Sequence, residues 1–249
     1  KAQIHQSLSE IDPLSWDSWF GKHYPFLRSS FLTGLEETGC TTERSGWQPA
    51  HITLSQGEET LATIPAYIKS HSYGEYVFDH AWARAFEQAG GRYYPKLLSA
   101  IPFTPVPGQR LITPHQDQLG DMFGVLAQWL DQQQFSSFHL LFARGEANET
   151  KPPFMLRKDL QFHWHNRNYK DFDDFLAALN SRKRKQIRKE RAKVQDSGLR
   201  IEFLCGDDIK PEHWDGFCRA HDATVDRKWG QAYLNRDTFA LLQERMGSC

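Results

Sequence analysis

Residues 48–69 read QPAHITLSQGEETLATIPAYIK, which is two strand-like runs joined by a short polar segment. Residues 48–54 and 60–69 are rich in β-branched and apolar side chains, and the turn-forming sequence Ser55-Gln56-Gly57-Glu58 separates them. Two such runs around a short glycine-containing loop predict a β-hairpin. Pro65 lies inside the second run, and because proline cannot donate to a strand ladder, we expect an edge position or a bulge there.

Helical and strand-like segments alternate on both sides of this hairpin. Apolar residues recur with a helical period between Phe26 and Leu35, and Gly39 follows them as a stop signal. The other predicted elements are a helix after Asp79, a helix over residues 117–133, and short strands over residues 97–101, 137–142 and 160–164. Because no regular strand–helix–strand rhythm is present, the pattern predicts an α/β (α+β) fold with a mixed sheet flanked by helices.

The character of the chain changes after Arg167. The predicted elements that follow are helices over residues 171–179, 181–193, 213–221 and 235–245, and one strand over residues 199–204. One strand cannot build a sheet core. We therefore expect a first domain over residues 1–168 and an incomplete second domain over residues 169–249, which is either cut short or completed by a partner.

The composition is that of an ordinary globular chain with many aromatic rings. The 249 residues carry a formal net charge of −1, and 13% of them are Phe, Trp or Tyr. No apolar run approaches the roughly 20 residues of a membrane span, and the balanced charge excludes a polycation that coats nucleic acid over its whole length. The rings indicate a thick core, a ring-lined cleft, or both. The phosphate-loop, dinucleotide-binding, zinc-protease and hydrolase motifs are absent, which argues against those enzyme classes.

The cysteines and the N-terminus both predict a cytoplasmic protein. Cys40, Cys205, Cys218 and Cys249 lie far apart, without the close pairs typical of zinc sites or the dense spacing of a disulfide framework. Scattered thiols are typical of cytoplasmic proteins. The sequence begins at Lys1 without an initiator methionine or the apolar region of a signal peptide, so we expect a cytoplasmic protein and a fragment of a longer chain.

The first candidate site surrounds Gly74. Lys69, Tyr73 and Glu75 place donors and acceptors at the end of a predicted strand, just before the helix after Asp79. Free backbone N–H groups at a helix N-terminus suit an anion or a polar substrate. The alternative is a solvated loop whose rings pack on the core.

The second candidate site is the segment of residues 92–110. Residues 102–108 contain three prolines and one glycine and follow a predicted strand, so they predict a rigid loop. Lys96 and Arg110 flank this loop and are suited to a phosphate or a carboxylate. The alternative is a proline-stiffened connection with ordinary surface cations.

The third candidate site is the run Gln161-Phe162-His163-Trp164-His165-Asn166-Arg167. On a strand, His163 and His165 share one face, and two neutral imidazoles there can take a proton from an attacking amine. Substrate contact, a metal site and hydrogen-bonded structural histidines are the alternatives, although the motif lacks a third metal ligand.

The fourth candidate site is the basic run of residues 181–193. Eight of its thirteen residues are Lys or Arg and one is acidic. On a helix these positive side chains point in nearly all directions around the axis and repel one another. Solvent, an acidic face of the same protein or a phosphate-rich ligand can offset that repulsion, and all three alternatives stay open. Since the rest of the chain is net acidic, the positive charge is local, as in a dedicated polyanion site.

Seven stretches of the chain match one known family and occur in its order. They are Pro25-Phe26-Leu27, Gly46-Trp47-Gln48-Pro49, Lys69-Ser70-His71-Ser72-Tyr73-Gly74-Glu75, Tyr94-Pro95-Lys96-Leu97-Leu98, Pro102-Phe103-Thr104-Pro105-Val106, Gln161-Phe162-His163-Trp164-His165-Asn166 and Ser181-Arg182-Lys183-Arg184-Lys185. With them the sequence resembles the bacterial FemAB-like family, GNAT-related acyltransferases described as peptidoglycan biosynthesis or recognition proteins.

The resemblance implies two tandem GNAT-type domains, each with a mixed sheet that splays open between central strands. GNAT-type enzymes bind acyl-CoA in that splay, whereas FemAB enzymes take an aminoacyl group from tRNA and attach it to the peptide of a cell-wall precursor. Residues 102–108 depart from the GNAT pyrophosphate signature Q/R-x-x-G-x-G/A. Proline lacks an N–H, so this departure disfavours acyl-CoA and leaves tRNA open.

These observations predict an N-acyltransferase that transfers an acyl or aminoacyl group to an amine, with a peptidoglycan precursor as candidate acceptor. Acyl-CoA or aminoacyl-tRNA is the expected co-substrate, and no metal or tightly bound cofactor is expected. The alternatives are a non-catalytic module that recognises a precursor or RNA, and a protein-interaction domain. The expected residues are, for catalysis, His163, His165 and Glu75; for substrate binding, Lys69, Tyr73, Tyr94, Lys96, Arg110 and Asn166; for polyanion binding, Arg182, Lys183, Arg184, Lys185 and Arg188.

Overall fold

The computed structural model describes residues 1–19, 24–145, 152–228 and 230–247 of the chain, which forms two compact units. The first unit combines Lys1–Leu156 with Gly206–Cys249, and the second unit is Arg157–Cys205. The predicted boundary between residues 168 and 169 falls inside the second unit. The C-terminal helices, which the sequence assigns to the second domain, belong to the first unit.

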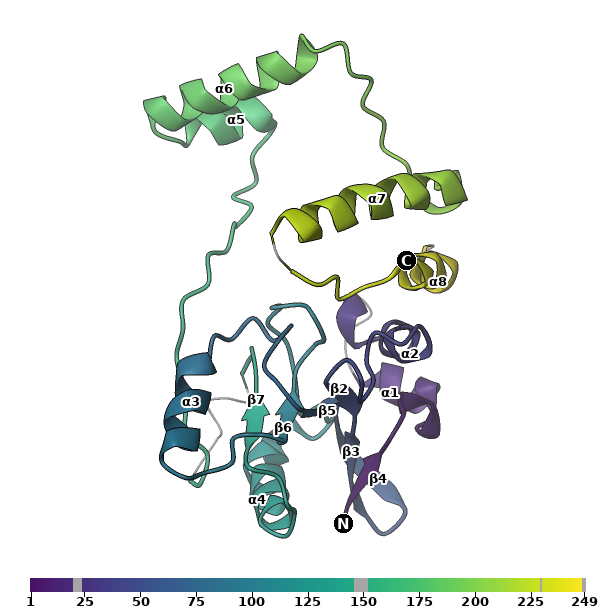
Figure 1. Ribbon diagram of the computed structural model, residues 1–249, viewed down its shortest axis with the longest axis vertical. Coiled ribbons are helices and arrows are strands. Elements are labelled where there is room, and N and C mark those ends of the chain that lie inside the picture. The colour runs from purple at the N-terminus through teal and green to yellow at the C-terminus, as the bar shows by residue number, and fades with distance from the viewer. Residues whose placement is uncertain (20–23, 146–151, 229, 248–249) are drawn as a thin grey trace. The chain divides into compact units, whose positions relative to one another are not determined.

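In the described part of the chain, the strands form two sheets within the first unit (Figure 1). The antiparallel sheet has the order β1-β3-β4 and contains β1 (Ala2–His5), β3 (His51–Gln56) and β4 (Glu59–Ile64). The mixed sheet has the order β2-β5-β6-β7 and contains β2 (Trp47–Pro49), β5 (Ala66–Lys69), β6 (Lys96–Ser99) and β7 (Phe138–Leu140), of which β6 and β7 run parallel. The predicted mixed α+β fold is confirmed, whereas the GNAT-like splay and the truncated second domain stay predictions.

The predicted hairpin connects the two sheets. β3 pairs with β4 around the turn at Gly57, and the register places Ile52 opposite Ile64. Each arm continues into the mixed sheet, as β2 and β5, after a break at Ala50 and at Pro65. Pro65 therefore lies where the chain passes from one sheet to the other, a position that tolerates the missing N–H donor.

Helix α4 (Leu119–Leu130) covers the hairpin and completes the main core. The helix follows a 3₁₀ turn, η3 (Gln116–Gln118), and confirms the prediction for residues 117–133. Its buried side chains recur with a helical period, so they form one apolar face. The core residues on this face and on the strands below it are Leu119, Met122, Phe123, Leu126, Ile52, Leu54, Ile64 and Leu97.

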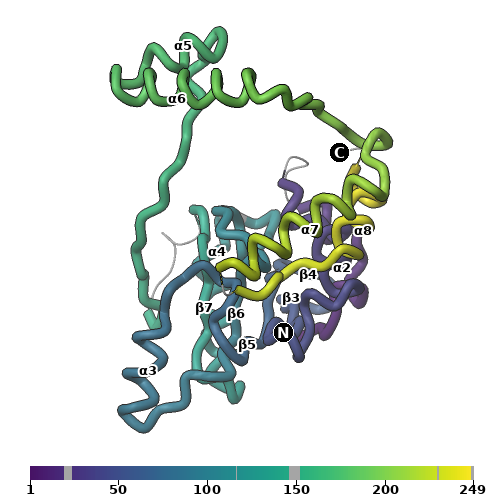
Figure 2. The backbone as a smooth tube through the Cα atoms, turned by 45° about the horizontal axis from the view of Figure 1, so that its top comes forward, coloured from purple at the N-terminus to yellow at the C-terminus, as the bar shows by residue number. Residues whose placement is uncertain are grey.

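Helices α7 (Pro211–Arg227) and α8 (Arg236–Met246) pack on each other, and α8 packs on α2 (Ser29–Glu37) (Figure 2). Arg245 donates to both carboxylate oxygens of Glu37, at 3.0 and 2.6 Å. The hydroxyl oxygens of Thr38 and Thr238 lie 2.8 Å apart, although 200 positions separate the two residues. These contacts are the reason that the C-terminal helices join the first unit and not the basic region that precedes them.

The second unit consists of a pair of helices and two extended segments. Helices α5 (Phe172–Ala177) and α6 (Ser181–Gln195) confirm the predictions for residues 171–179 and 181–193. The predicted strands over residues 160–164 and 199–204 are wrong: both segments are exposed, and in the described ranges no strand pairs with either of them. Their alternating apolar pattern is typical of strands, but a strand requires a hydrogen-bonded neighbour.

Short helices complete the first unit. They are η1 (Leu8–Glu10), α1 (Pro13–Ser18), η2 (Pro25–Leu27), α3 (His80–Gln88) and η5 (Gly206–Asp208). Among the residues that the structure describes, no helix has the length and apolar character needed to span a membrane.

Candidate functional site

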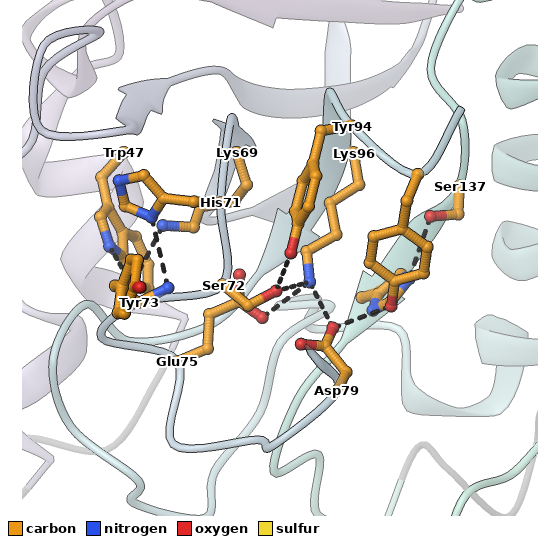
Figure 3. Close-up of polar contacts among 12 residues, drawn as sticks. Trp47, Lys69, His71, Ser72, Tyr73, Glu75, Asp79, Tyr94, Lys96 and Ser137 are labelled. Atoms are coloured by element: carbon orange, nitrogen blue, oxygen red, sulfur yellow. Dashed lines mark hydrogen bonds and ion pairs between the residues drawn. The ribbon is translucent and has the colours of Figure 1, made fainter. Parts of the chain in front are cut away.

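The loop of residues 70–79, between β5 and α3, closes over the fully buried side chain of Lys96 (Figure 3). Lys96 Nζ donates hydrogen bonds to Ser72 Oγ at 2.8 Å, to Glu75 Oε2 at 2.9 Å and to Asp79 Oδ2 at 2.7 Å. An ammonium group has three N–H donors, so the protein uses all of them. Lys96 therefore attaches the loop to β6, and this arrangement leaves no donor for a substrate.

Two tyrosines extend the network around Lys96. The hydroxyl oxygens of Tyr94 and Ser72 lie 2.8 Å apart, and the Tyr93 hydroxyl donates to Asp79 Oδ2 at 2.8 Å. Burial raises the pKa of Tyr93, and its hydrogen bond to the Asp79 carboxylate acts in the same direction. Burial also raises the pKa of Tyr94, so both tyrosine hydroxyls are neutral near pH 7.

The two carboxylates of the network, Asp79 and Glu75, differ in how well their surroundings stabilise the ionised form. Burial opposes ionisation of Asp79, but hydrogen bonds from Lys96, Ser72 and Tyr93 outweigh it and lower the pKa of Asp79. Burial raises the pKa of Glu75, and the attraction of Lys96 offsets only part of that effect. One oxygen of each carboxylate, Glu75 Oε1 and Asp79 Oδ1, has no hydrogen-bond partner among the described residues, so the difference lies in the bonds to the other oxygen. Glu75 is thus the less stable anion of the pair.

Lys69 is a second buried lysine in contact with the same loop. Its Nζ donates to the Tyr73 carbonyl at 3.3 Å and lies 3.8 Å from the centre of the Trp47 ring. Burial lowers the pKa of Lys69 to about 7; the charge of Glu75 opposes the shift, and that of Lys96 adds to it. Near neutral pH, this amine is therefore divided between its charged and neutral forms.

Two glycines allow the loop to approach its neighbours closely. Gly74 has a φ of +79°, and a Cβ there would lie 2.7 Å from Cδ1 of Phe103. Gly46 has a φ of +69°, and a Cβ there would collide with the imidazole of His71. Both positions combine a left-handed backbone with a close contact, so only glycine fits without strain.

A cavity of about 870 Å³ lies beside this loop, and segments far apart in the sequence line it. His71 and Tyr73 contribute from the loop, Trp47 from β2, and residues 230–235 from the connection between α7 and α8. Figure 3 shows Trp47, His71 and Tyr73 grouped at one end of the loop and the Lys96 cluster at the other. The size is that of an ordinary small-molecule site.

Aromatic rings form much of the cavity wall. The rings of Phe103 and Tyr233 stack with centres 5.0 Å apart and an angle of 10° between their planes. The ring centres of Trp47 and Phe103 lie 5.1 Å apart. The indole N–H of Trp47 donates a hydrogen bond to the Tyr73 carbonyl at 3.0 Å. Such rings present flat apolar surfaces to the apolar part of a ligand.

His71 is a neutral, fixed member of the cavity wall. Burial lowers the pKa of His71, and the nearby charge of Lys69 acts in the same direction. Its Nδ1 accepts a hydrogen bond from the Tyr73 backbone N–H at 3.3 Å. The ring thus supports the conformation of the loop, and its accepting nitrogen is already engaged.

His221 and Asp222 form a histidine–carboxylate pair in the cavity wall. His221 Nδ1 lies 3.2 Å from Asp222 Oδ1, and both side chains line the cavity. If Nδ1 carries the proton, the carboxylate orients the imidazole and leaves Nε2 as an acceptor, which is how a general base is held. Within the described ranges, Nε2 of His221 has no hydrogen-bond partner.

The cations of the cavity differ in their surroundings. Arg236 Nε contacts Asp215 Oδ1 at 2.5 Å, so this guanidinium is already ion-paired. Arg44 is exposed at the cavity and makes no ion pair or side-chain hydrogen bond within the described part of the chain. An unpaired guanidinium beside aromatic walls is suited to an anionic group of a ligand.

The structure brings five of the predicted site residues into one region and places Arg110 in a different role. The five are Lys69, Tyr73, Glu75, Tyr94 and Lys96. Of these, Tyr73 lines the cavity and is 62% exposed. Arg110 is fully buried and donates to the carbonyls of Leu141 at 2.9 Å and Val106 at 2.6 Å. It holds the proline-rich loop in place.

The remaining predicted catalytic residues belong to the second unit. His163 and His165 are exposed, and their rings stack with centres 6.3 Å apart and a 21° angle between planes. The Asn166 side chain accepts from the Asn168 backbone N–H at 3.0 Å. The prediction that the two imidazoles act in catalysis stays a prediction.

The basic helix α6 uses its cations in two ways. One group contacts α5: Arg184 donates to the Ala177 carbonyl at 3.2 Å, Arg188 to Asp173 at 3.4 Å, and the Arg191 guanidinium lies 4.2 Å from the centre of the Phe172 ring. The second group is exposed and makes no ion pair in the described ranges; it consists of Arg182, Lys183, Lys185, Lys189 and Lys193.

Sequence reasoning missed the residues that close the cavity. Arg44, Phe103, His221, Asp222 and Tyr233 come from segments that meet only after folding. The local signals are a His-Asp pair at the end of the helix predicted over residues 213–221 and a glycine beside Trp47, and both are too common to identify a site. In the described part of the chain, no group of three or more His, Cys, Asp or Glu side chains is placed to hold a metal ion.

The comparisons with known proteins give one family and no individual relative. The FemAB-like family, described as acting in peptidoglycan biosynthesis/recognition, matches residues 7–249, which is nearly the whole chain. No curated protein and no solved structure gives a significant match.

Proposed function

Because the chain belongs to the FemAB-like family of peptidoglycan biosynthesis and recognition proteins, we propose that it is an N-acyltransferase that acts on the amine of a peptidoglycan precursor. The observation that carries the proposal is the His221–Asp222 pair in the cavity of about 870 Å³. Acyl transfer to an amine needs a pocket that positions two substrates and a group that accepts one proton. The cavity offers both.

In the proposed reaction, the neutral amine of the acceptor attacks the activated carbonyl carbon of the donor. The C–N bond forms, and the bond from the carbonyl carbon to the leaving oxygen or sulfur breaks with its electron pair. His221 Nε2 accepts the proton that the amine loses and delivers it to the leaving group. Asp222 stabilises the imidazolium while it exists.

The buried lysines have a positioning role in this proposal. Lys96 fixes the loop of residues 70–79 through Ser72, Glu75 and Asp79. Lys69 Nζ donates to the Tyr73 carbonyl and lies over the Trp47 ring. Both side chains are fully buried, so they support the cavity wall without touching a substrate. Glu75 acts with them and not as the proton acceptor.

The donor is a phosphate-bearing molecule in this proposal, either acyl-CoA or aminoacyl-tRNA. The exposed cations of α6 favour aminoacyl-tRNA, because Lys and Arg side chains that make no ion pair in the described ranges match the charges of a sugar–phosphate backbone. Pro102, Pro105 and Pro107, which lack an N–H, make the loop after β6 a poor cradle for the pyrophosphate of CoA.

The test incubates the 249-residue chain with each donor class and with muropeptide precursors that carry a free amine, and measures the acylated product by mass spectrometry. We expect product formation, and we expect His221→Gln to lower the rate by about a hundredfold or more. His115→Gln, outside the cavity, is the matched control and is expected to leave the rate unchanged. Saturable precursor binding without product from any donor would identify a recognition module instead.

A further inference from the structure

The cavity carries opposite charges on different segments, and both charged groups are available to a ligand. Arg44 lies before β2 and has no ion-pair partner within the described ranges. Asp222 lies on α7, and its carboxylate side chain is 63% exposed. Of its two oxygens, Oδ1 contacts His221, and within the part of the chain that the structure describes no partner occupies Oδ2.

The only other arginine that lines the cavity among the described residues, Arg236, is neutralised by Asp215 at 2.5 Å. A single free guanidinium balances a single negative charge. A carboxylate carries one negative charge, and its two oxygens match two parallel N–H donors of a guanidinium. A phosphate dianion would require a second cation. The balance of charge therefore favours a carboxylate at Arg44.

The wall that accompanies these two charges is apolar and flat. Phe103 and Tyr233 stack on each other, and Trp47 lies beside Phe103. Methylene groups pack well on such rings, while the charged ends of a ligand remain at the polar groups. A molecule with an amine at one end, a carboxylate at the other and a short apolar stem matches all three features.

We propose that the cavity binds a zwitterionic acceptor, whose carboxylate pairs with Arg44 and whose amine lies at Asp222 and His221. This inference rests on the proposed function, because it assigns the substrate class of the same cavity. It adds that the acceptor must carry an acid group at a fixed distance from the reacting amine. Arg44 thereby favours acceptors that carry a carboxylate over amines that lack one, a difference that does not affect the contact with His221.

The test measures binding without a donor, so that it gives a result even if the chain transfers no acyl group. The probes are unbranched ω-amino acids from 3-aminopropanoate to 8-aminooctanoate, titrated into the 249-residue chain and followed by ligand-observed NMR. We expect the affinity to peak at one chain length, because the two charged subsites are fixed in space. Conversion of the carboxylate of that probe to a carboxamide, or acetylation of its amine, is expected to weaken binding about tenfold or more.

Two variants identify which residue of the cavity binds each end of the probe. Arg44→Gln is expected to weaken the amino acid about tenfold and to leave the carboxamide analogue unaffected, whereas Asp222→Asn is expected to weaken the amino acid and to leave the N-acetyl analogue unaffected. Arg84→Gln on α3 and Asp226→Asn on α7 are exposed matched controls and should change neither affinity.

Three results would overturn the inference. They are equal binding of the amino acid and its carboxamide, an Arg44→Gln variant that binds both probes as the parent does, and competition by inorganic phosphate that exceeds competition by acetate. If acyl transfer occurs but Arg44→Gln leaves it unchanged for acceptors with and without a carboxylate, the proposed function stands and only this inference fails. If no donor supports transfer but the zwitterion binds at Arg44, the cavity is a recognition site.

Discussion

Lys96 donates to Asp79 across 2.7 Å, at a position where solvent reaches almost none of either side chain. Removal of the ammonium would leave the Asp79 and Glu75 carboxylates buried without their cation. An uncompensated buried charge costs about 3–5 kcal/mol. We therefore expect Lys96→Met to lower the free energy of unfolding by about this amount, as measured by urea denaturation at pH 7.

The matched control removes the charges together. In the triple variant with Lys96→Met, Glu75→Gln and Asp79→Asn, no carboxylate is left unpaired, so we expect a large part of the lost stability to return. If the triple variant were less stable than Lys96→Met alone, the ion pairs would not be the source of the effect.

The titration of Lys69 predicts a pH-dependent stability. In the unfolded chain, a lysine keeps its proton up to about pH 10.5, while in the fold the pKa of Lys69 is about 7. Between these two values the unfolded state binds more protons, so stability rises with pH by at most about 1.4 kcal/mol per unit. Well below pH 7 both states are protonated and the contribution is constant.

We therefore expect Lys69→Met to be more stable than the parent chain at pH 6.5 and to lose that advantage as the pH rises from 7 to 9. The groups that face Lys69 are Glu75, Asp79, Lys96 and His71, and burial keeps His71 neutral across this range. Urea denaturation at four pH values measures the difference. Lys189→Met, at an exposed position of α6, should show no such trend; a parallel pH profile for the two Met variants would contradict the low pKa.

The local elements of this chain could be predicted from the sequence, because their signals are local. The apolar period of Leu119, Phe123 and Leu126 gives α4, and the turn at Gly57 between two strand-like runs gives the hairpin. Residues 160–164 and 199–204 carry the same kind of signal and form no strand, because pairing depends on a neighbour that the pattern does not specify.

The sequence predicts Lys69 and Lys96 as substrate ligands and gives no sign of their burial, because lysine is almost never fully buried. Glu75 and Asp79, with which Lys96 pairs, lie 21 and 17 positions away, and only the fold brings the three together. The cavity is harder still to predict. It requires α8 to pack on α2, and the contact of Thr38 with Thr238 has no local pattern in either segment.

That packing gives a further prediction for stability. Thr238 is fully buried, and its hydroxyl contacts Thr38 Oγ1 at 2.8 Å and Cys40 Sγ at 3.0 Å. Thr238→Val keeps the shape but loses these contacts, so we expect a loss of about 1–3 kcal/mol. Arg245→Gln breaks a half-exposed ion pair and should cost less than about 1 kcal/mol.

Limited proteolysis distinguishes the two variants. We expect Thr238→Val to expose the connection between α7 and α8 to cleavage, and Arg245→Gln to leave its protection close to that of the parent. Equal cleavage of both variants and the parent would show that α8 does not depend on this buried contact.

The role of His163 and His165 is open to a direct comparison with His221. Both imidazoles are exposed and, among the residues that the structure describes, contact no buried group, so the double variant His163→Gln/His165→Gln should fold as the parent does. If they accept the proton in catalysis, this variant loses turnover; if His221 does, it keeps turnover while His221→Gln loses it. We expect the second outcome, and rates from the same acyl-transfer assay decide between them.

The division of cations on α6 predicts which of them bind a polyanion. At about 100° per residue, Arg182, Lys185, Lys189 and Lys193 lie within about 80° of one another around the helix and extend about 16 Å along it. Arg184, Arg188 and Arg191 lie on another face, where they contact α5. If the first group neutralises four phosphates of a single strand, log K should fall with log salt by about 3.

We therefore expect simultaneous substitution of Arg182, Lys185, Lys189 and Lys193 by Gln to remove most of the salt dependence of binding to polyuridylate, measured by fluorescence anisotropy between 50 and 300 mM salt. Substitution of Arg184, Arg188 and Arg191 by Gln removes almost as much charge, but we expect it to loosen the α5–α6 pair, seen as lost helicity, while most of the salt slope remains. Equal slopes for the two variants would mean that net charge alone drives binding, and a flat response of the parent chain would argue against any nucleic acid on this helix, because neutralised phosphates always release counterions.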